Sequence, residues 1–301
     1  MKHTFFAALI LAACVLGACA EQDTHAPTSA ETSEFESPYF AVTTSGSGPD
    51  VILVPGLASS GAVWDGTVAA LSDRFTLHVV QVNGFAGAPA LGNENNDNIL
   101  EDLATDLSAY SRELAPSPVL IGHSLGGLVA IKTALHPDTK LSRLVIVDVL
   151  PFFSVLMDPD ATAESIAPVS EVMKVALLGQ SDDQFALRQA EALSALVKGE
   201  DDLEQALNWS VESDRAVMAQ AMSEVLTADL RGEMSTLAVP THIIFAKDDT
   251  IPNMAEIEAF YRTLYAPVPD HSLIAIENAL HFVMLDQPAA FYAALEGLLA
   301  E

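Results

Sequence analysis

The stretch that decides the fold is residues 120–129, Leu-Ile-Gly-His-Ser-Leu-Gly-Gly-Leu-Val. Its first residues form an apolar run typical of a short buried strand, and a helix is expected to begin at about Leu125. Gly122 and Gly126 flank Ser124, because a sharp strand-to-helix turn has no room for side chains at those two positions. Such a turn exposes the hydroxyl above the sheet, so the stretch predicts a nucleophilic serine. The alternative is a glycine-rich turn in which Ser124 only caps the helix.

The backbone amide after the serine has a role of its own in this interpretation. It belongs to Leu125, at the N-terminus of the predicted helix, where N–H groups have no partner within the helix and the helix dipole favours negative charge. We therefore expect it to be one donor of an oxyanion hole, the pair of N–H groups that stabilises the negative oxygen formed when a nucleophile attacks a carbonyl.

A nucleophilic serine needs a base, and the eight histidines differ in where they lie. Most fall in predicted strands, at element ends or near the N-terminus, and His123 is directed away from Ser124. Only His281 follows the last predicted strand, on a loop that can carry an imidazole over the carboxyl edge of the sheet. The chain order serine, acid, histidine requires a base at this place, so His281 is predicted to be the base. The alternative is a structural hydrogen-bonding histidine.

The histidine in turn needs a carboxylate that fixes its tautomer and stabilises its charged form. Asp248 and Asp249 follow the predicted strand at residues 242–245, at the edge where the loops of a parallel sheet gather. Asp249 is predicted to be this acid, and Asp248 a turn residue. Asp148, at the end of the preceding strand, is a third candidate, which serves either as the acid or as a cap where the next segment begins.

Apolar runs outline the rest of the folded domain. Strands are expected at residues 40–44, 51–54, 75–82, 119–121, 144–149, 242–245 and 273–276, and helices at 63–71, 98–114, 125–136 and 288–299. Apolar strands that alternate with helices indicate an α/β fold, with a mostly parallel central sheet and helices on both faces. Asn98 is expected to cap its helix, with Glu101 completing a capping box. Residues 150–237 contain amphipathic helices and no strand, which predicts an all-helical lid over the site.

The N-terminus carries export signals. A basic start precedes an apolar run at residues 5–15, and Leu16-Gly17-Ala18-Cys19 resembles the lipobox of bacterial lipoproteins. The resemblance implies a signal peptide at residues 1–19, a lipid on Cys19, and a location in the cell envelope, in the periplasm or at the outer membrane. A lipobox at Cys14, and ordinary cleavage that yields a soluble secreted protein, are alternatives. Residues 20–38 are expected to form a flexible tether and residues 39–301 the folded domain, which includes the predicted lid.

Composition excludes several kinds of partner and chemistry. The net charge is −28, from 13 basic and 41 acidic residues, and such a field repels nucleic acid and anionic membrane surfaces. Contact with a membrane is therefore expected only through a lipid at Cys19. Both cysteines, Cys14 and Cys19, lie in the N-terminal segment, so the domain has no disulfide and no thiol nucleophile. The sequence leaves the oligomeric state open.

Four motifs, in this order and spacing, make the chain similar to the α/β-hydrolase superfamily over about residues 39–300. They are Val54-Pro55-Gly56-Leu57, Gly122-His123-Ser124-Leu125-Gly126-Gly127, Ala246-Lys247-Asp248-Asp249 and His281-Phe282-Val283-Met284-Leu285-Asp286-Gln287-Pro288. The resemblance implies a lid after the sixth strand, and a second oxyanion donor at the amide of Leu57. It favours Asp249 as the acid, since Ala246 takes the place of a glycine that usually stands three residues before it. Two features depart from the family: Pro55-Gly56 replaces a common His-Gly, and the three-glycine run of lipases is absent.

The resemblance also implies a reaction, the hydrolysis of a carboxylic ester through an acyl-enzyme on Ser124, without a metal or organic cofactor. The apolar lid and the absence of a basic cluster favour a small, neutral, partly hydrophobic substrate. Lactones, thioesters, peptide amides and the carbon–carbon bonds of meta-cleavage products are alternatives within the superfamily. A binding protein without catalytic activity on the same scaffold is the alternative from another class.

Overall fold

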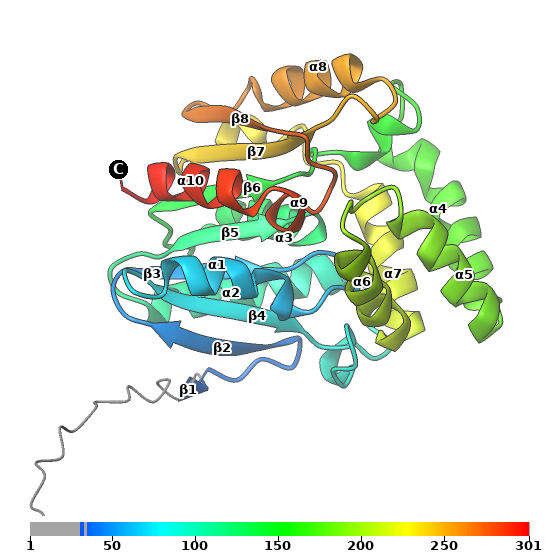
Figure 1. Ribbon diagram of the computed structural model, residues 1–301, viewed down its shortest axis with the longest axis horizontal. Helices are drawn as coiled ribbons and strands as arrows, with labels where there is room; N and C mark the ends of the chain where they lie inside the picture. Colours follow the sequence, from blue (N-terminus) through cyan, green and yellow to red (C-terminus); the bar gives the residue numbers. More distant parts are fainter. Residues whose placement is uncertain (1–30, 33–34, 301) are drawn as a thin grey trace, which may run out of the picture.

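The computed structural model describes residues 31–32 and 35–300, and it contains one eight-stranded sheet (Figure 1). The strands are β1 (Glu31–Thr32), β2 (Phe40–Gly46), β3 (Asp50–Val54), β4 (Thr76–Val82), β5 (Val119–His123), β6 (Arg143–Val147), β7 (Thr241–Lys247) and β8 (His271–Glu277). Their order in the sheet is β1-β2-β4-β3-β5-β6-β7-β8. Strand β2 runs antiparallel to both of its neighbours, and the other neighbouring pairs are parallel. The predicted α/β class with a mostly parallel sheet is confirmed.

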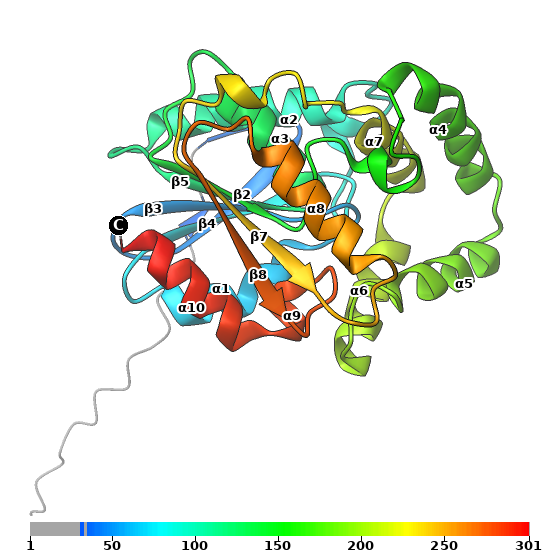
Figure 2. The ribbon, with the colours of Figure 1, turned by 90° about the horizontal axis from the view of Figure 1, so that it is seen from above.

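Helices cover both faces of this sheet (Figure 2). One face carries α2 (Ile99–Glu113), α3 (Leu125–Leu135) and α8 (Met254–Tyr265), and the other carries α1 (Asp65–Leu71), α9 (Val283–Asp286) and α10 (Pro288–Leu299). Buried apolar side chains form two large clusters. Strands β3, β5 and β6 are buried at every residue after the first. Because both faces of these strands are covered, their sequences are continuous apolar runs without alternation.

The register of the parallel strands brings four loops together at one edge of the sheet. His123, the last residue of β5, lies opposite Val147, the last residue of β6. Val147 in turn lies opposite Ile244 of β7, which pairs with Ile274 of β8. The loops that follow these strands therefore gather at the carboxyl edge, where ligands of open α/β sheets bind.

Between β6 and β7 the chain forms helices, as the sequence predicts for residues 150–237. The elements are η3 (Phe153–Leu156), α4 (Ala163–Leu178), α5 (Asp182–Leu193), α6 (Glu200–Glu212), α7 (Arg215–Thr227) and η4 (Met234–Thr236). Figure 1 shows α4 to α7 gathered at one end of the sheet, with α4 and α5 outermost. We call helices α4 to α7 with their connections the helical insertion. That it moves as a lid stays a prediction.

One contact of the insertion replaces a predicted helix cap. Asn98 makes no side-chain hydrogen bond to the first turn of α2. The Glu224 carboxylate of α7 accepts instead from the N–H of Ile99 at 2.9 Å and from that of Leu100 at 2.8 Å. The predicted capping box of Asn98 and Glu101 is wrong, because a charged acceptor from another helix binds these amides more strongly than a neutral side chain does.

Ordered contacts begin earlier in the chain than residue 39. Strand β1 pairs with β2, and the Ser37 hydroxyl donates to Asp106 at 2.7 Å, so part of the predicted tether belongs to the folded domain. The predicted signal peptide and the lipidation site Cys19 lie outside the described residues. In the part of the chain that is described, no helix has both the length and the apolar character needed to cross a bilayer.

Candidate active site

Ser124 lies at the sharp turn between β5 and α3, with φ 54° and ψ −122°. A positive φ is strained for a residue with a side chain. Two glycines allow the turn: a Cβ at Gly122 would lie 2.1 Å from the carbonyl oxygen of Gly126, and one at Gly126 would lie 2.5 Å from that of Pro55. The Ser124 side chain makes no capping hydrogen bond to α3. The interpretation of Ser124 as a helix cap is therefore wrong, and the turn has the geometry of a nucleophile elbow.

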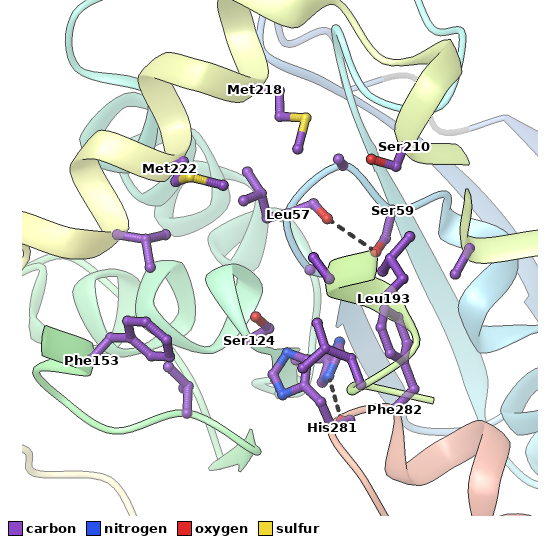
Figure 3. A pocket seen from close by; sticks show the side chains of 18 of the residues that line it. Leu57, Ser59, Ser124, Phe153, Leu193, Ser210, Met218, Met222, His281 and Phe282 are labelled. Atoms are coloured by element: carbon purple, nitrogen blue, oxygen red, sulfur yellow. Dashed lines mark hydrogen bonds between the residues drawn. The ribbon is translucent and has the colours of Figure 1, made fainter. Parts of the chain in front are cut away.

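The His281 imidazole lies beside the Ser124 side chain (Figure 3), on the loop after β8. Its Nδ1–H donates to Oδ2 of Asp148 at 2.7 Å. In a neutral imidazole a proton on Nδ1 leaves Nε2 as the acceptor, which is the atom that a general base needs. The fold thus brings together the predicted nucleophile and the predicted base.

Asp148 follows β6 directly and is held by three donors. Oδ1 accepts from the backbone N–H of Ala246 at 2.8 Å and from the hydroxyl of Tyr261 at 3.1 Å, while Oδ2 faces His281. Burial, and then the neighbouring Asp148 carboxylate, raise the pKa of Tyr261 well above its ordinary value, so its hydroxyl keeps the proton that it donates. With φ 50° at Asp148, the chain turns sharply after the strand. These contacts leave the carboxylate one orientation, towards the imidazole.

Asp249 is not the carboxylate that His281 contacts. Its side chain is exposed, and the neighbouring Asp248 is buried against Lys198 and Thr250. Those contacts, above all the hydrogen bond from Lys198, lower the pKa of Asp248 to about 2. The prediction that Asp249 is the partner of His281 is wrong, and the third candidate takes its place. The physical reason is the strand order: β6 is the neighbour of β5 in the sheet and β7 is not, so the loop after β6 begins nearer to Ser124.

A second histidine supports this arrangement, and the sequence interpretation did not identify it. His123 is fully buried, and its Nε2–H donates to the backbone carbonyl of His281 at 3.0 Å. The two rings lie 4.6 Å apart between centroids. Burial, and then the nearby His281, lower the pKa of His123 to about 3, so the ring is neutral at neutral pH and adds no charge beside the base. The available signal was its position at the buried end of a strand, directly before Ser124.

Two backbone amides lie where an oxyanion hole is expected. Leu57 lines the cavity after β3, and Leu125 is the first residue of α3. Within the described residues, the Leu57 amide donates to no backbone acceptor in the surrounding loops, and the Leu125 amide donates to none outside α3. Gly56 permits a close approach to the elbow, since a Cβ there would lie 3.1 Å from Nδ1 of His123 and 3.2 Å from Cβ of Ser124. The role of the two amides as oxyanion donors stays a prediction.

Ser124, His281 and Asp148 open into a cavity of about 340 Å³ beneath the helical insertion. The apolar wall is formed mainly by the insertion and the turn before it: Phe153, Met157, Met173, Leu193, Leu196, Met218, Met222, Val225 and Leu226. Besides Ser124, His281, Asp148 and His123, the polar side chains of the lining are Ser59, Gln189 and Ser210, and Figure 3 shows Leu57 and Ser59 between Ser124 and Ser210. Among the described residues, no group of three or more His, Cys, Asp or Glu side chains is placed to hold a metal ion.

Comparison with known proteins identifies the family of the chain. Residues 51–294 match the model of the alpha/beta hydrolase family. A pimeloyl-[acyl-carrier protein] methyl ester esterase of Aeromonas hydrophila is 28% identical over 254 residues, which cover 83% of this chain and 95% of the relative. An esterase of the same description from Vibrio cholerae is 30% identical over 206 residues, which cover 68% of this chain and 78% of the relative.

Among solved structures, a hydrolase from Pseudomonas aeruginosa superposes with a TM-score of 0.71 at 21% identity, over 87% of this chain and 94% of that one. This likeness supports the fold alone, whereas the family model covers most of the chain. The protein belongs to the α/β-hydrolase family and is an enzyme of the hydrolase class.

Proposed function

We propose that this protein is a serine hydrolase that cleaves a carboxylic ester with a triad of Ser124, His281 and Asp148. The observation that carries the proposal is the 2.7 Å hydrogen bond from His281 to Asp148, at the cavity into which the strained Ser124 turn opens. A triad is recognised by geometry and by the roles of its members, not by their positions in the sequence.

The reaction begins when Nε2 of His281 takes the hydroxyl proton of Ser124 and Oγ attacks the carbonyl carbon of the ester. The Asp148 carboxylate holds the Nδ1–H tautomer and stabilises the imidazolium. The amides of Leu57 and Leu125 donate to the oxyanion of the tetrahedral intermediate. His281 then protonates the leaving alcohol, and an acyl-enzyme remains on Ser124. A water molecule that loses its proton to His281 attacks this acyl group, which releases the carboxylic acid and regenerates the serine.

The cavity supports a neutral substrate with an apolar acyl group. Its wall is mainly aliphatic, aromatic and thioether in character, and cavities of a few hundred Å³ enclose small organic ligands. The relatives in Aeromonas and Vibrio are described as esterases for the methyl ester of an acyl group on a carrier protein. For this chain we propose the ester of a small alcohol with an acyl chain of medium length.

The proposal extends to the location of the enzyme and to the helical insertion. The sequence of residues 1–19 supports export and anchorage at the cell envelope through a lipid on Cys19. The share of the cavity wall that comes from the insertion supports its action as a lid, which excludes water while the acyl-enzyme forms.

Hydrolysis of p-nitrophenyl esters from acetate to palmitate tests the function, with the full-length protein compared with Ser124→Ala. We expect turnover with an optimum at medium chain length, and a loss of at least about 10³-fold in the variant. A fluorophosphonate probe that labels the wild type but not Ser124→Ala serves as the control for a reactive serine. A wild type that is neither active nor labelled would contradict the proposal, whereas a labelled protein that cleaves no ester would reject only the ester as substrate.

A further inference from the structure

The loop that carries His281 is held on both sides of the imidazole. On one side, the N–H of Leu280 donates to Oδ2 of Asp286 at 2.7 Å. On the other, the N–H of Phe282 donates to the carbonyl of Leu196 at 3.1 Å. The first acceptor is the side chain of Asp286, six residues after Leu280, and the second is the backbone of Leu196 in the helical insertion.

Asp286 also contacts the insertion directly. Its second oxygen, Oδ1, accepts from the backbone N–H of Lys198 at 2.8 Å. Lys198 lies in the linker between α5 and α6, residues 194–199. One carboxylate therefore joins the backbone of the catalytic loop to the backbone of the linker. Only a group with two acceptor oxygens and no proton satisfies both N–H groups, because an amide would direct its own N–H donors at one of them.

The linker is attached to the body at a further point. The Lys198 ammonium pairs with Asp248 after β7, which is buried. The linker also contributes Leu196 to the cavity wall, where Phe282 and His281 lie as well. A movement that separated the linker from the body would break the bonds from Lys198 to Asp286 and from Phe282 to Leu196, and both bonds border the base.

We infer that Asp286 is a positioning residue for His281, and that it makes the placement of the imidazole depend on the linker of the helical insertion. The inference rests on the proposed function, in which His281 is the base. Asp286 touches neither the substrate nor the reacting atoms. It fixes the residue before His281, while His123 fixes the carbonyl of His281 itself.

The test is the full-length Asp286→Asn variant, which keeps the size of the side chain and removes one acceptor. Asp270→Asn is the matched control, since Asp270 is exposed and undergoes the same loss of charge. Should Asp286→Asn fail to fold, Lys198→Pro removes the N–H that donates to Asp286, and Lys198→Met removes the ion pair with Asp248 but keeps that N–H. Comparison of the two Lys198 variants isolates the bond from the linker.

We expect kcat of Asp286→Asn on a p-nitrophenyl ester to fall about 10- to 100-fold with KM within about threefold, because misplaced catalytic groups lose rate more than binding. Lys198→Pro is expected to lose more kcat than Lys198→Met. The second readout is the downfield proton resonance of the His281 Nδ1–H, assigned by its loss in His281→Gln. It should broaden or shift in Asp286→Asn and stay unchanged in Asp270→Asn.

A variant that keeps the kcat and the resonance of the wild type overturns the inference, even if it melts at a lower temperature, because lower stability alone signifies a structural role. The resonance also separates this inference from the proposed function. If the wild type cleaves no ester and binds no fluorophosphonate, the proposed function fails, and the resonance still shows whether Asp286 positions His281.

Discussion

The carboxyl edge of the sheet and the helical insertion meet at one cavity but are built in opposite ways. At the sheet edge, Asp148 receives three hydrogen bonds and His123 is fully buried. In the insertion and the turn before it, large apolar side chains remain exposed: Leu156, Met157, Val169, Val172, Met173, Val175, Leu178, Leu187 and Val211. Elsewhere in the described chain, only Leu91 is large, apolar and exposed to that degree.

The difference follows from what each region contributes. Charge that develops in a transition state is stabilised by groups fixed in advance, so the sheet edge has to be rigid. A cavity wall that contacts acyl chains needs complementary shape and flexibility more than fixed hydrogen bonds. Methionine side chains such as Met218 and Met222 are flexible and can fit around different ligands. Under the proposed function, the sheet edge carries the chemistry and the insertion selects the acyl group.

The largest expected effect tests the acid at the sheet edge. Asp148→Asn should lower kcat about 10³- to 10⁴-fold, since the amide no longer stabilises the imidazolium and favours the wrong tautomer of His281. Asp249→Asn is the matched control, and its kcat should stay within about twofold because Asp249 is exposed and the imidazole donates to Asp148 instead. Steady-state rates on one p-nitrophenyl ester measure both. If Asp249→Asn proved the slower enzyme, the assignment of the acid would be reversed.

The next effect concerns pH and the buried histidine of the sheet edge. The folded state holds the pKa of His123 at about 3, against an ordinary value of 6.5, so unfolded chains bind a proton that the fold excludes. Above pH 6.5 this difference costs the folded state nothing. As the pH falls from 6.5 towards 3, the free energy of unfolding decreases by about 1.4 kcal/mol for each pH unit. Denaturant unfolding between pH 7 and 4 should show a weaker pH dependence for His123→Gln than for the wild type. Equal slopes would show that His123 is not the group responsible.

A smaller effect tests the insertion as the region that selects the acyl chain. Met222→Phe should lower kcat/KM for an octanoyl ester about tenfold while that for the acetyl ester changes less than about threefold, because a bulkier wall shortens the space for the chain. Val172→Phe is the control, since Val172 lies on α4 with 69% of its surface exposed and does not line the cavity. A uniform loss on both esters would place Met222 with the chemistry and not with the selection.

The smallest effect concerns the ion pair that joins the two regions. Lys198 is the main cause of the low pKa of Asp248, so their contact stabilises the fold above the ordinary carboxyl pKa and is lost as the pH falls through about 2. Lys198→Met should lower the melting temperature at pH 7 by about 2 °C or less, since ion pairs with an exposed partner contribute little. Calorimetry should show the difference from the wild type shrinking as the pH falls from 5 towards 2. A difference that grew in acid would mean that another contact of Lys198 dominates.

The sequence by itself determined the α/β class and the places of two site residues. Apolar runs with the length of buried strands, alternating with helices, are sufficient for a parallel sheet, because each run has to be covered on both faces. The elbow at Ser124 could be recognised from a short stretch of the chain, since Gly122 is required by contact with Gly126 only four residues along, although Gly126 is required by the carbonyls of Val54 and Pro55. His281 could be located because only one histidine follows the last strand on the loop at the sheet edge.

Tertiary structure alone decided the partner of His281 and the contacts around it. Asp148 and Asp249 both follow a buried strand, and their local sequences do not separate them. What separates them lies far along the chain: the Ala246 amide and the Tyr261 hydroxyl orient Asp148, whereas Lys198 engages the neighbour of Asp249. The bond of His123 to the loop of the base, and the bond of Asp286 to the linker of the insertion, likewise join distant segments. A hydrogen bond between two loops depends on strand order and on the helices packed behind them, and neither is a property of any short stretch of sequence.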